Sequence, residues 1–205
     1  MKHASDAAVL RAQAGELGAD LGERQLAKLL AYERLLEERA VSTGLVAKGD
    51  VGRIRVRHVL DSLRAVAPLA GARDAYDLGS GAGLPGIVVA VSLPGLRVGL
   101  VDSRRRRVAF LELAVAELGL SNAGVLGVRA ETLTEPVDAC LARAFAPAPR
   151  AWGIAEPLLR PGGRLLYFAG RGERPEDLRT RTPVLEVLST PVLESGGPLV
   201  IMARQ

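Results

Sequence analysis

Glycines recur at alternate positions in one segment of this chain, and that segment constrains the possible fold most strongly. It reads Asp77-Leu-Gly-Ser-Gly-Ala-Gly-Leu-Pro-Gly86 and overlaps a short apolar run that begins at Ala75. Glycines with this spacing let the backbone turn sharply after a strand and approach a ligand closely. The segment therefore predicts a strand that ends in a ligand-binding loop and is followed by a helix.

The segments after this loop alternate between strand and helix patterns. Such alternation is typical of parallel strands joined by right-handed crossovers. It predicts an α/β fold with a doubly wound, mostly parallel, seven-stranded, Rossmann-like sheet. We expect Ser103 to cap the helix after the second strand and Gly119 to end it. The expected strands span 75–78, 96–101, 124–128, 139–142, 164–168, 184–188 and 199–202, and the expected helices 84–92, 104–118 and 152–159.

The region before the first strand has a different pattern. Apolar residues recur at helical spacing from about Ala7 to Arg39 and again from Ile54 to Leu69, with a loop expected at 44–52. The sequence contains no internal repeat and no low-complexity linker. We therefore expect a single domain, 1–205, in which a helical extension, residues 1–70, precedes the α/β core, residues 71–205.

Charge and composition limit the partners and the compartment. A net charge of +4 allows an anionic partner without requiring one, and the run Arg104–Arg107 is either a solvated face or a phosphate contact. One cysteine, Cys140, and two histidines exclude a disulfide and a multi-cysteine or histidine-rich metal site. We expect Cys140 in the core, no signal peptide, no membrane span and a cytoplasmic location. The uncharged stretch 78–96 is long enough for a span, but its glycines and prolines disfavour a continuous helix.

Carboxylates near the ends of successive strands indicate the ligand. Asp77 directly precedes the glycines, where an anion suits a sulfonium and an ammonium group better than a pyrophosphate. Asp102 lies about twenty residues further on, where an acidic side chain binds ribose hydroxyls, and Glu131 follows the third strand. This order favours S-adenosyl-L-methionine. A nicotinamide oxidoreductase fits Asp102 equally, but every lysine precedes the first strand, which disfavours a Tyr-Lys dyad.

With these residues assembled, the chain resembles the bacterial RsmG family, also called glucose-inhibited division protein B. The likeness runs from about Leu10 to the C-terminus in family order. It implies methylation of guanine N7 in small-subunit (16S) ribosomal RNA, with S-adenosyl-L-methionine as cofactor. It also implies ribosomal RNA or the small ribosomal subunit as partner, and a monomer without a metal. Besides the glycine segment, the matching stretches are Arg57-His58-Val-Leu-Asp61-Ser62-Leu63, Val101-Asp102-Ser103, Arg106-Arg107-Val-Ala-Phe110-Leu111, Arg129-Ala-Glu131 and Arg143-Ala-Phe-Ala146.

The resemblance assigns roles to individual residues. The residues that it implies at the cofactor, with Asp102 on the ribose, are Gly79, Leu84, Asp102, Ala130, Glu131 and Arg143. The neighbouring positions that we expect in the same site are Asp77, Gly81, Gly83 and Ser103. The catalytic residues that we expect are Arg143, Arg57 and His58. Guanine N7 has a free lone pair, so attack on a sulfonium methyl group needs no general base and can rely on positioning and electrostatics.

The same side chains admit structural explanations. Arg57 and Asp61 occupy i and i+4 positions on one helix, where an ordinary surface ion pair would account for both. Arg143 would then pair with Asp138 or Glu156 and only stabilise the fold.

Some positions depart from the family pattern and leave alternatives open. Ala169-Gly170 replaces a Lys-Gly, Arg53 replaces an acidic residue, and Ser195–Pro198 replaces a charged segment. The chain could instead methylate a different substrate, or it could be a catalytically silent, cofactor-binding, RNA-associated protein.

Overall fold

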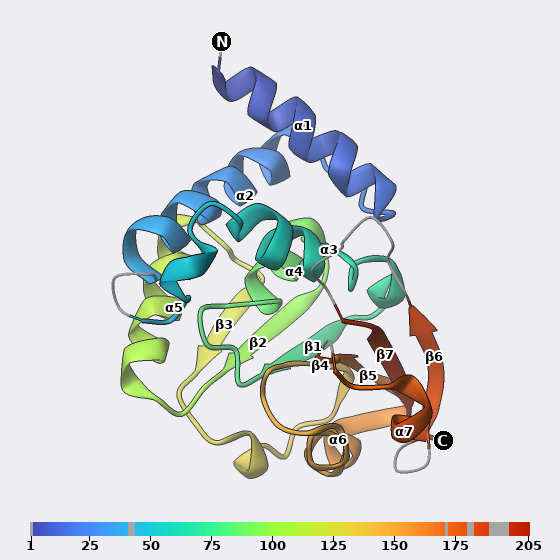
Figure 1. The fold of residues 1–205 in the computed structure, drawn as a ribbon. Helices are drawn as coiled ribbons and strands as arrows, with labels where there is room; N and C mark the ends of the chain where they lie inside the picture. Colours follow the sequence, from blue (N-terminus) through green and yellow to red (C-terminus); the bar gives the residue numbers. More distant parts are fainter. Residues whose placement is uncertain (1, 41–43, 171, 180–182, 189–196) are drawn as a thin grey trace.

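The computed structural model describes residues 2–40, 44–170, 172–179, 183–188 and 197–205. Its centre is a seven-stranded sheet in the order β3-β2-β1-β4-β5-β7-β6, in which only β7 runs antiparallel to its neighbours (Figure 1). The predicted fold class is confirmed. The strands are β1 (Asp74–Leu78), β2 (Arg97–Val101), β3 (Ala123–Leu126), β4 (Val137–Arg143), β5 (Leu159–Phe168), β6 (Val184–Leu188) and β7 (Leu199–Ala203).

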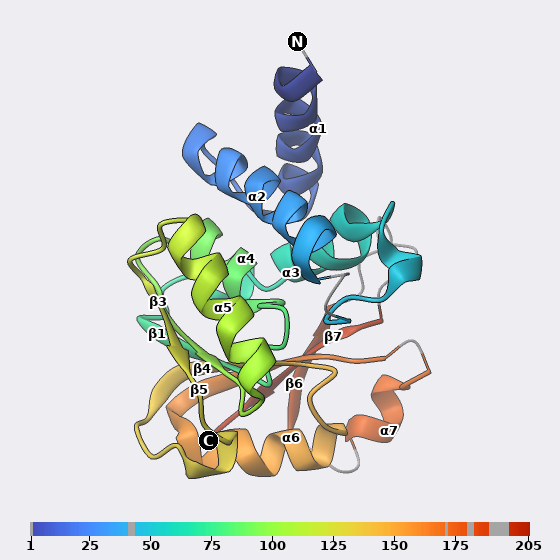
Figure 2. The same ribbon diagram turned by 90° about the vertical axis from the view of Figure 1, so that its left-hand side faces the viewer.

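Helices cover both faces of the sheet, so the central strands are apolar on both sides. The N-terminal helices, α4 and α5 lie over one face, and α6 and α7 lie over the other (Figure 2). Cys140 and Trp152 belong to the apolar cluster around α6. None of the described helices is both long and apolar enough to cross a membrane. The helices are α1 (Lys2–Glu16), α2 (Glu23–Leu35), α3 (Asp61–Leu63), α4 (Gly86–Ser92), α5 (Arg105–Glu117), α6 (Ala148–Ala155) and α7 (Pro175–Arg179).

Two predicted features at helix ends are wrong. The predicted helix 7–39 is two helices, because Gly18 adopts a left-handed conformation (φ 75°) that ends α1. Ser103 does not cap α5: Arg104 is the capping residue, and its backbone N–H donates to Asp102 Oδ1 at 2.9 Å. A carboxylate two residues before the cap thus replaces the hydroxyl that we expected there.

Two boundaries near the end of the core also differ from the prediction. The helix expected at 152–159 is α6, which begins at Ala148 and ends at Ala155. Strand β5 begins at Leu159 rather than at Arg164, and it continues through a turn at Gly162 (φ 77°). Proline and glycine normally indicate the end of a strand, which is why the sequence predicted a later start. Strand β5 contains them because its pairing with β4 shifts register at this turn.

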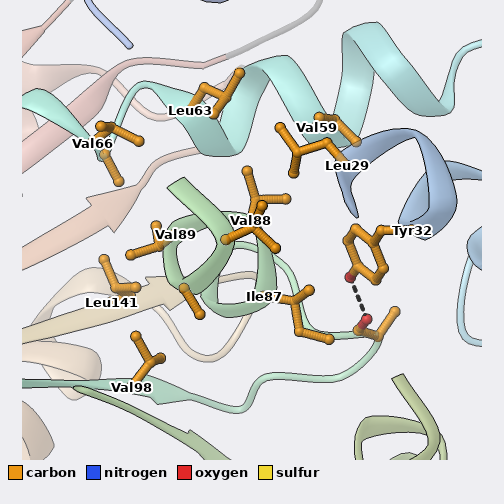
Figure 3. Close-up of a cluster of buried hydrophobic side chains, with 14 of the residues drawn as sticks. Leu29, Tyr32, Val59, Leu63, Val66, Ile87, Val88, Val89, Val98 and Leu141 are labelled. Carbon is orange, nitrogen blue, oxygen red and sulfur yellow. Dashed lines mark hydrogen bonds between the residues drawn. The ribbon is translucent and has the colours of Figure 1, made fainter. Parts of the chain in front are cut away.

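The N-terminal helices pack directly on the core of the sheet. Side chains of α2 and of the π-helix Arg55–Leu60, which carries Arg57 and His58, meet those of α4 in one continuous apolar cluster (Figure 3). Tyr32 lies in it with no exposed surface, and its hydroxyl donates to the carbonyl oxygen of Ala82 at 2.6 Å. Because Ala82 belongs to the glycine loop, this buried hydrogen bond joins the extension to the predicted ligand site.

We expect Tyr32→Phe to destabilise the protein by about 1 to 3 kcal/mol, because it leaves the Ala82 carbonyl without its buried donor. Urea unfolding measures this loss. Tyr76→Phe, at a half-buried position on β1, is the control and should change stability by much less. Equal stability of Tyr32→Phe and the native protein would show that the hydrogen bond contributes nothing.

Candidate cofactor and active site

The glycine loop connects β1 to α4 at the point where the strand order reverses. Gly79, Gly81 and Gly83 all have positive φ, at 68°, 62° and 91°. A Cβ on Gly79 would lie 2.5 Å from the Phe145 ring, and one on Gly83 would lie 2.3 Å from Ile87. A Cβ on Gly81 would meet only the Gly79 carbonyl oxygen, at 3.7 Å. Close packing therefore requires the outer two glycines, whereas the middle one borders open space.

Asp77, near the end of β1, is hydrogen-bonded to the residues that follow it in the loop. Its Oδ2 accepts hydrogen bonds from the Gly86 N–H, at 3.0 Å, and from the Ser80 hydroxyl. Its Oδ1 is buried and has no hydrogen-bond partner within the described part of the chain. Burial raises the pKa of Asp77 to about 6, although these hydrogen bonds and the charge of Arg143 oppose that rise. The protein thus keeps a poorly solvated carboxyl group with one free oxygen beside the loop.

Asp102 lies at the end of β2 and is almost completely buried. Its Oδ2 accepts hydrogen bonds from the Gly81 N–H and from the Arg107 guanidinium, both at 3.1 Å. The carboxylate borders a pocket of about 230 Å³ at the carboxyl ends of the strands. Its walls include Gly79, Asp102, Ser103, Ala130, Glu131 and Phe145.

The structure thus divides the predicted cofactor residues into two groups. Those at the ends of β2 and β3, together with Gly79, border the pocket. The others are not part of its wall. Gly83 packs on Ile87 and Tyr32, and Leu84 packs against the apolar core. Asp77 binds the loop from β1, Gly81 faces open space, and Arg143 lies at the end of β4. Phe145 was not predicted, although an aromatic residue two positions after Arg143 was the available signal.

Arg143, Arg57 and His58 are brought together at the end of β4. Arg143 Nη2 donates to the Arg57 carbonyl oxygen at 2.7 Å and contacts His58 Nδ1 at 3.0 Å. The same nitrogen is 3.5 Å from Asp61 Oδ2. Arg143 Nη1 is buried, with no hydrogen-bond partner among the residues that the structure describes. The guanidinium is therefore anchored on one side and has an unused donor on the other.

A second pocket, of about 400 Å³, lies beside Arg143. Arg143 and Ala144 border this pocket, whereas Phe145 borders the smaller one. Ala169, which replaces the family lysine, is also part of its wall and is buried. Ser195 and Gly196 of the other departure lie outside the described residues. The remaining polar residues that line the larger pocket are Arg57, Asp61, Tyr167 and Glu173.

The Arg57–Asp61 ion pair, which helical spacing offered as a structural explanation, is not formed among the described residues. Arg57 pairs with Asp50 rather than with Asp61. Asp61 instead accepts from Arg64, at 2.8 Å, and lies near Arg143.

The two acidic residues considered as structural partners of Arg143 do not pair with it in the described part of the chain. Asp138, near the amino end of β4, pairs with Arg73 and Arg160. The acidic partner of Arg143 is Asp61 rather than Asp138 or Glu156. Asp61 thus keeps a partner at helical spacing, Arg64 at i+3, whereas Asp138 pairs with cations that only the tertiary fold brings close.

Similarity to solved structures identifies the class of fold. The O-methyltransferase from Bacillus cereus, solved in complex with SAH, has a similar fold, with a TM-score of 0.61 and 18% identity over 85% of this chain and 90% of that one. The fold is that of S-adenosylmethionine-dependent methyltransferases.

The sequence then identifies the family. Residues 25–193 match the family described as rRNA small subunit methyltransferase G, and the chain belongs to this family. Ribosomal RNA small subunit methyltransferase G of Acidiphilium cryptum (strain JF-5) is 45% identical over 149 residues, 70% of this chain and 68% of that protein. The protein of the same name from Acidovorax sp. (strain JS42) is 35% identical over 206 residues, 91% of this chain and 90% of that protein. The predicted family and methyltransferase class are confirmed.

The raised pKa of Asp77 predicts a pH-dependent stability. A carboxyl group whose pKa is higher in the folded state stabilises the protein at low pH, and this contribution is lost as the pH rises from about 4 to about 6. Asp77→Asn keeps an acceptor oxygen and cannot ionise. We expect the variant and the native protein to have the same free energy of unfolding at about pH 4. At about pH 7 the variant should be more stable by on the order of 1 to 3 kcal/mol. Urea unfolding of both proteins across this pH range tests the prediction. A stability difference between them that does not change with pH would contradict it.

Proposed function

We propose that this chain transfers a methyl group from S-adenosyl-L-methionine to guanine N7 of small-subunit ribosomal RNA. Membership of the family supports the reaction class. One observation carries the proposal at the site: the segment Arg143–Phe145 separates two adjoining pockets at the carboxyl ends of the strands. The smaller pocket suits a nucleoside cofactor, and the larger one offers cationic donors to a nucleotide.

The residues of the smaller pocket fit the cofactor. Asp102 presents a buried carboxylate to ribose hydroxyls, and Ala130 and Glu131 border the place for the adenine edge. Gly81 leaves open space beside the loop, and Asp77 supplies a free, buried carboxyl oxygen for positive charge. When bound, the cofactor supplies a methyl group on a sulfonium, which is electrophilic without further activation.

The remaining chemistry is positioning. Guanine N7 is unprotonated at neutral pH, so the chain needs to hold the base and stabilise shifting charge rather than remove a proton. Arg143 borders the larger pocket, and its buried Nη1 has no partner among the described residues, so this guanidinium has a donor left for an acceptor on the guanine edge or for a phosphate. Arg57 and His58 hold this guanidinium in place.

The surface beside the smaller pocket supports an RNA partner. Arg104, Arg105 and Arg106 are exposed there, at the start of α5, where the helix dipole gives cations no stabilisation. Exposed arginines with this placement suit phosphate contacts. We further infer a single domain that acts as a monomer in the cytoplasm and needs no metal.

The direct test compares ribosomal RNA from cells with and without the gene, by nucleoside mass spectrometry, and then restores methylation with purified protein and cofactor. We expect one 7-methylguanosine to disappear from the small-subunit RNA. Gly81→Val should abolish cofactor binding in calorimetry, because its side chain enters the open space beside the loop. Cofactor binding without any RNA change would favour a silent protein, and an unchanged RNA with methylation of another molecule would favour a different substrate.

Arg143→Ala should reduce single-turnover methylation by at least ~10²-fold, as the loss of a transition-state donor does. Arg143→Lys should recover only part of the rate, because an ammonium lacks the planar, directional donors of the guanidinium. Arg160→Ala is the matched control: it removes ion pairs with Asp74 and Asp138 near the amino ends of β1 and β4. The control should lower the melting temperature and leave turnover unchanged. Unchanged turnover in Arg143→Ala would end the catalytic role.

A further inference from the structure

We propose that Asp50 is a positioning residue that selects one tautomer of His58 and thereby orients the Arg143 guanidinium for methyl transfer. The functional part of this inference rests on the function proposed above. Asp50 lies in the turn Lys48–Asp50 of the N-terminal extension and is only 8% exposed. No sequence pattern predicted a role for it, because it precedes the Arg57-His58 helix by a loop.

The contacts of Asp50 come first. Its Oδ1 accepts a hydrogen bond from the Arg57 guanidinium, and its Oδ2 lies 3.1 Å from His58 Nε2. A carboxylate can only accept hydrogen bonds. A contact at this distance with a neutral ring therefore requires the ring proton to sit on Nε2.

The opposite side of the imidazole leads to the same assignment. His58 Nδ1 is 3.0 Å from Arg143 Nη2, and a guanidinium can only donate. Nδ1 must then be the unprotonated, accepting nitrogen. The donor on one side and the acceptor on the other thus agree on a single neutral tautomer, with its proton on Nε2.

This tautomer determines how Arg143 is held. Nη2 is directed to the Arg57 carbonyl oxygen, His58 Nδ1 and the nearby Asp61, which leaves Nη1 as the unused donor. If Asp50 were lost, the proton could move to Nδ1. Two donors would then face each other across 3.0 Å, and the guanidinium would have to turn away.

Protonation of His58 would have the same effect. Burial and the neighbouring Arg143 lower the pKa of His58, with Arg57 acting in the same direction and Asp50 in the opposite one. The neutral ring is therefore the state at neutral pH. As the pH falls, a proton on Nδ1 would face Arg143, so turnover should decline on the acid side. Because Asp50 raises the pKa of His58, this decline should move to lower pH in Asp50→Asn.

Nuclear magnetic resonance of ¹⁵N-labelled histidine tests the tautomer directly. His3→Gln leaves His58 as the single histidine of the chain. We expect the Nε2–H form in this background and a shift towards the Nδ1–H form in Asp50→Asn, whose amide can donate to Nε2. A native spectrum of the Nδ1–H form, or of rapidly exchanging tautomers, would overturn the proposal. This measurement involves no methylation, so its outcome is independent of the proposed function.

Kinetics of the same variants test the consequence. Asp50→Asn should lower kcat about 10- to 100-fold and leave cofactor affinity unchanged, since Asp50 contacts Arg57 and His58, neither of which borders the smaller pocket. Asp50→Glu should restore both the tautomer and part of the rate. Asp138→Asn, which weakens the pairs with Arg73 and Arg160, is the control and should lower only the melting temperature. A folded Asp50→Asn protein with native kcat, or a rate loss without a tautomer change, would reject the positioning role.

Discussion

Two hydrogen bonds from Arg143 join the end of β4 to a helix that precedes it by 85 and 86 residues in sequence. The strand supplies the guanidinium, and the N-terminal extension supplies the carbonyl oxygen, the ring nitrogen and the carboxylate around it. Neither part of the chain could present this side chain alone, because a lone buried cation is strongly disfavoured. The helical extension therefore helps to build the candidate active site, besides covering one face of the sheet (Figure 2).

The glycine loop is held by hydrogen bonds from two sides, one of them from the same extension. Tyr32 reaches the glycine loop through a fully buried hydroxyl, and Asp77 braces the loop from the sheet. The two contacts differ in their effect on stability. The hydrogen bond of Tyr32 stabilises the fold, whereas burial disfavours the ionised form of the Asp77 carboxyl group and raises its pKa. A group retained at such a cost is typical of a binding site whose ligand carries the complementary charge.

Local sequence patterns predicted much of this fold. The alternation of glycines, the 3.6-residue and two-residue periodicities and the strand-end carboxylates depend on near neighbours in the chain, so they can be read without the fold. Errors arose where one hydrogen bond, one neighbouring strand or one backbone conformation decides the outcome and the periodicity does not show it. The cap of α5 is Arg104, with the Asp102 carboxylate accepting from its N–H, and β5 passes through its glycine turn because β4 continues beside it. Gly18 ends α1 although the apolar pattern continues past it.

For the site, the sequence by itself determined the chemistry available: a glycine loop at a strand end, acidic groups after the next strands, and Arg143 after the fourth. Tertiary structure decided most of the partners. Arg57 binds Asp50, and Arg143 contacts His58 and lies near Asp61, although helical spacing suggests none of these pairings. Asp61 does have a partner at helical spacing, Arg64 at i+3, but spacing alone suggested Arg57 as well. The physical reason is that exposed pairs at helical spacing gain little, whereas a charge that folding buries must be paired. Burial is a property of the whole chain, so local patterns could not choose among these partners.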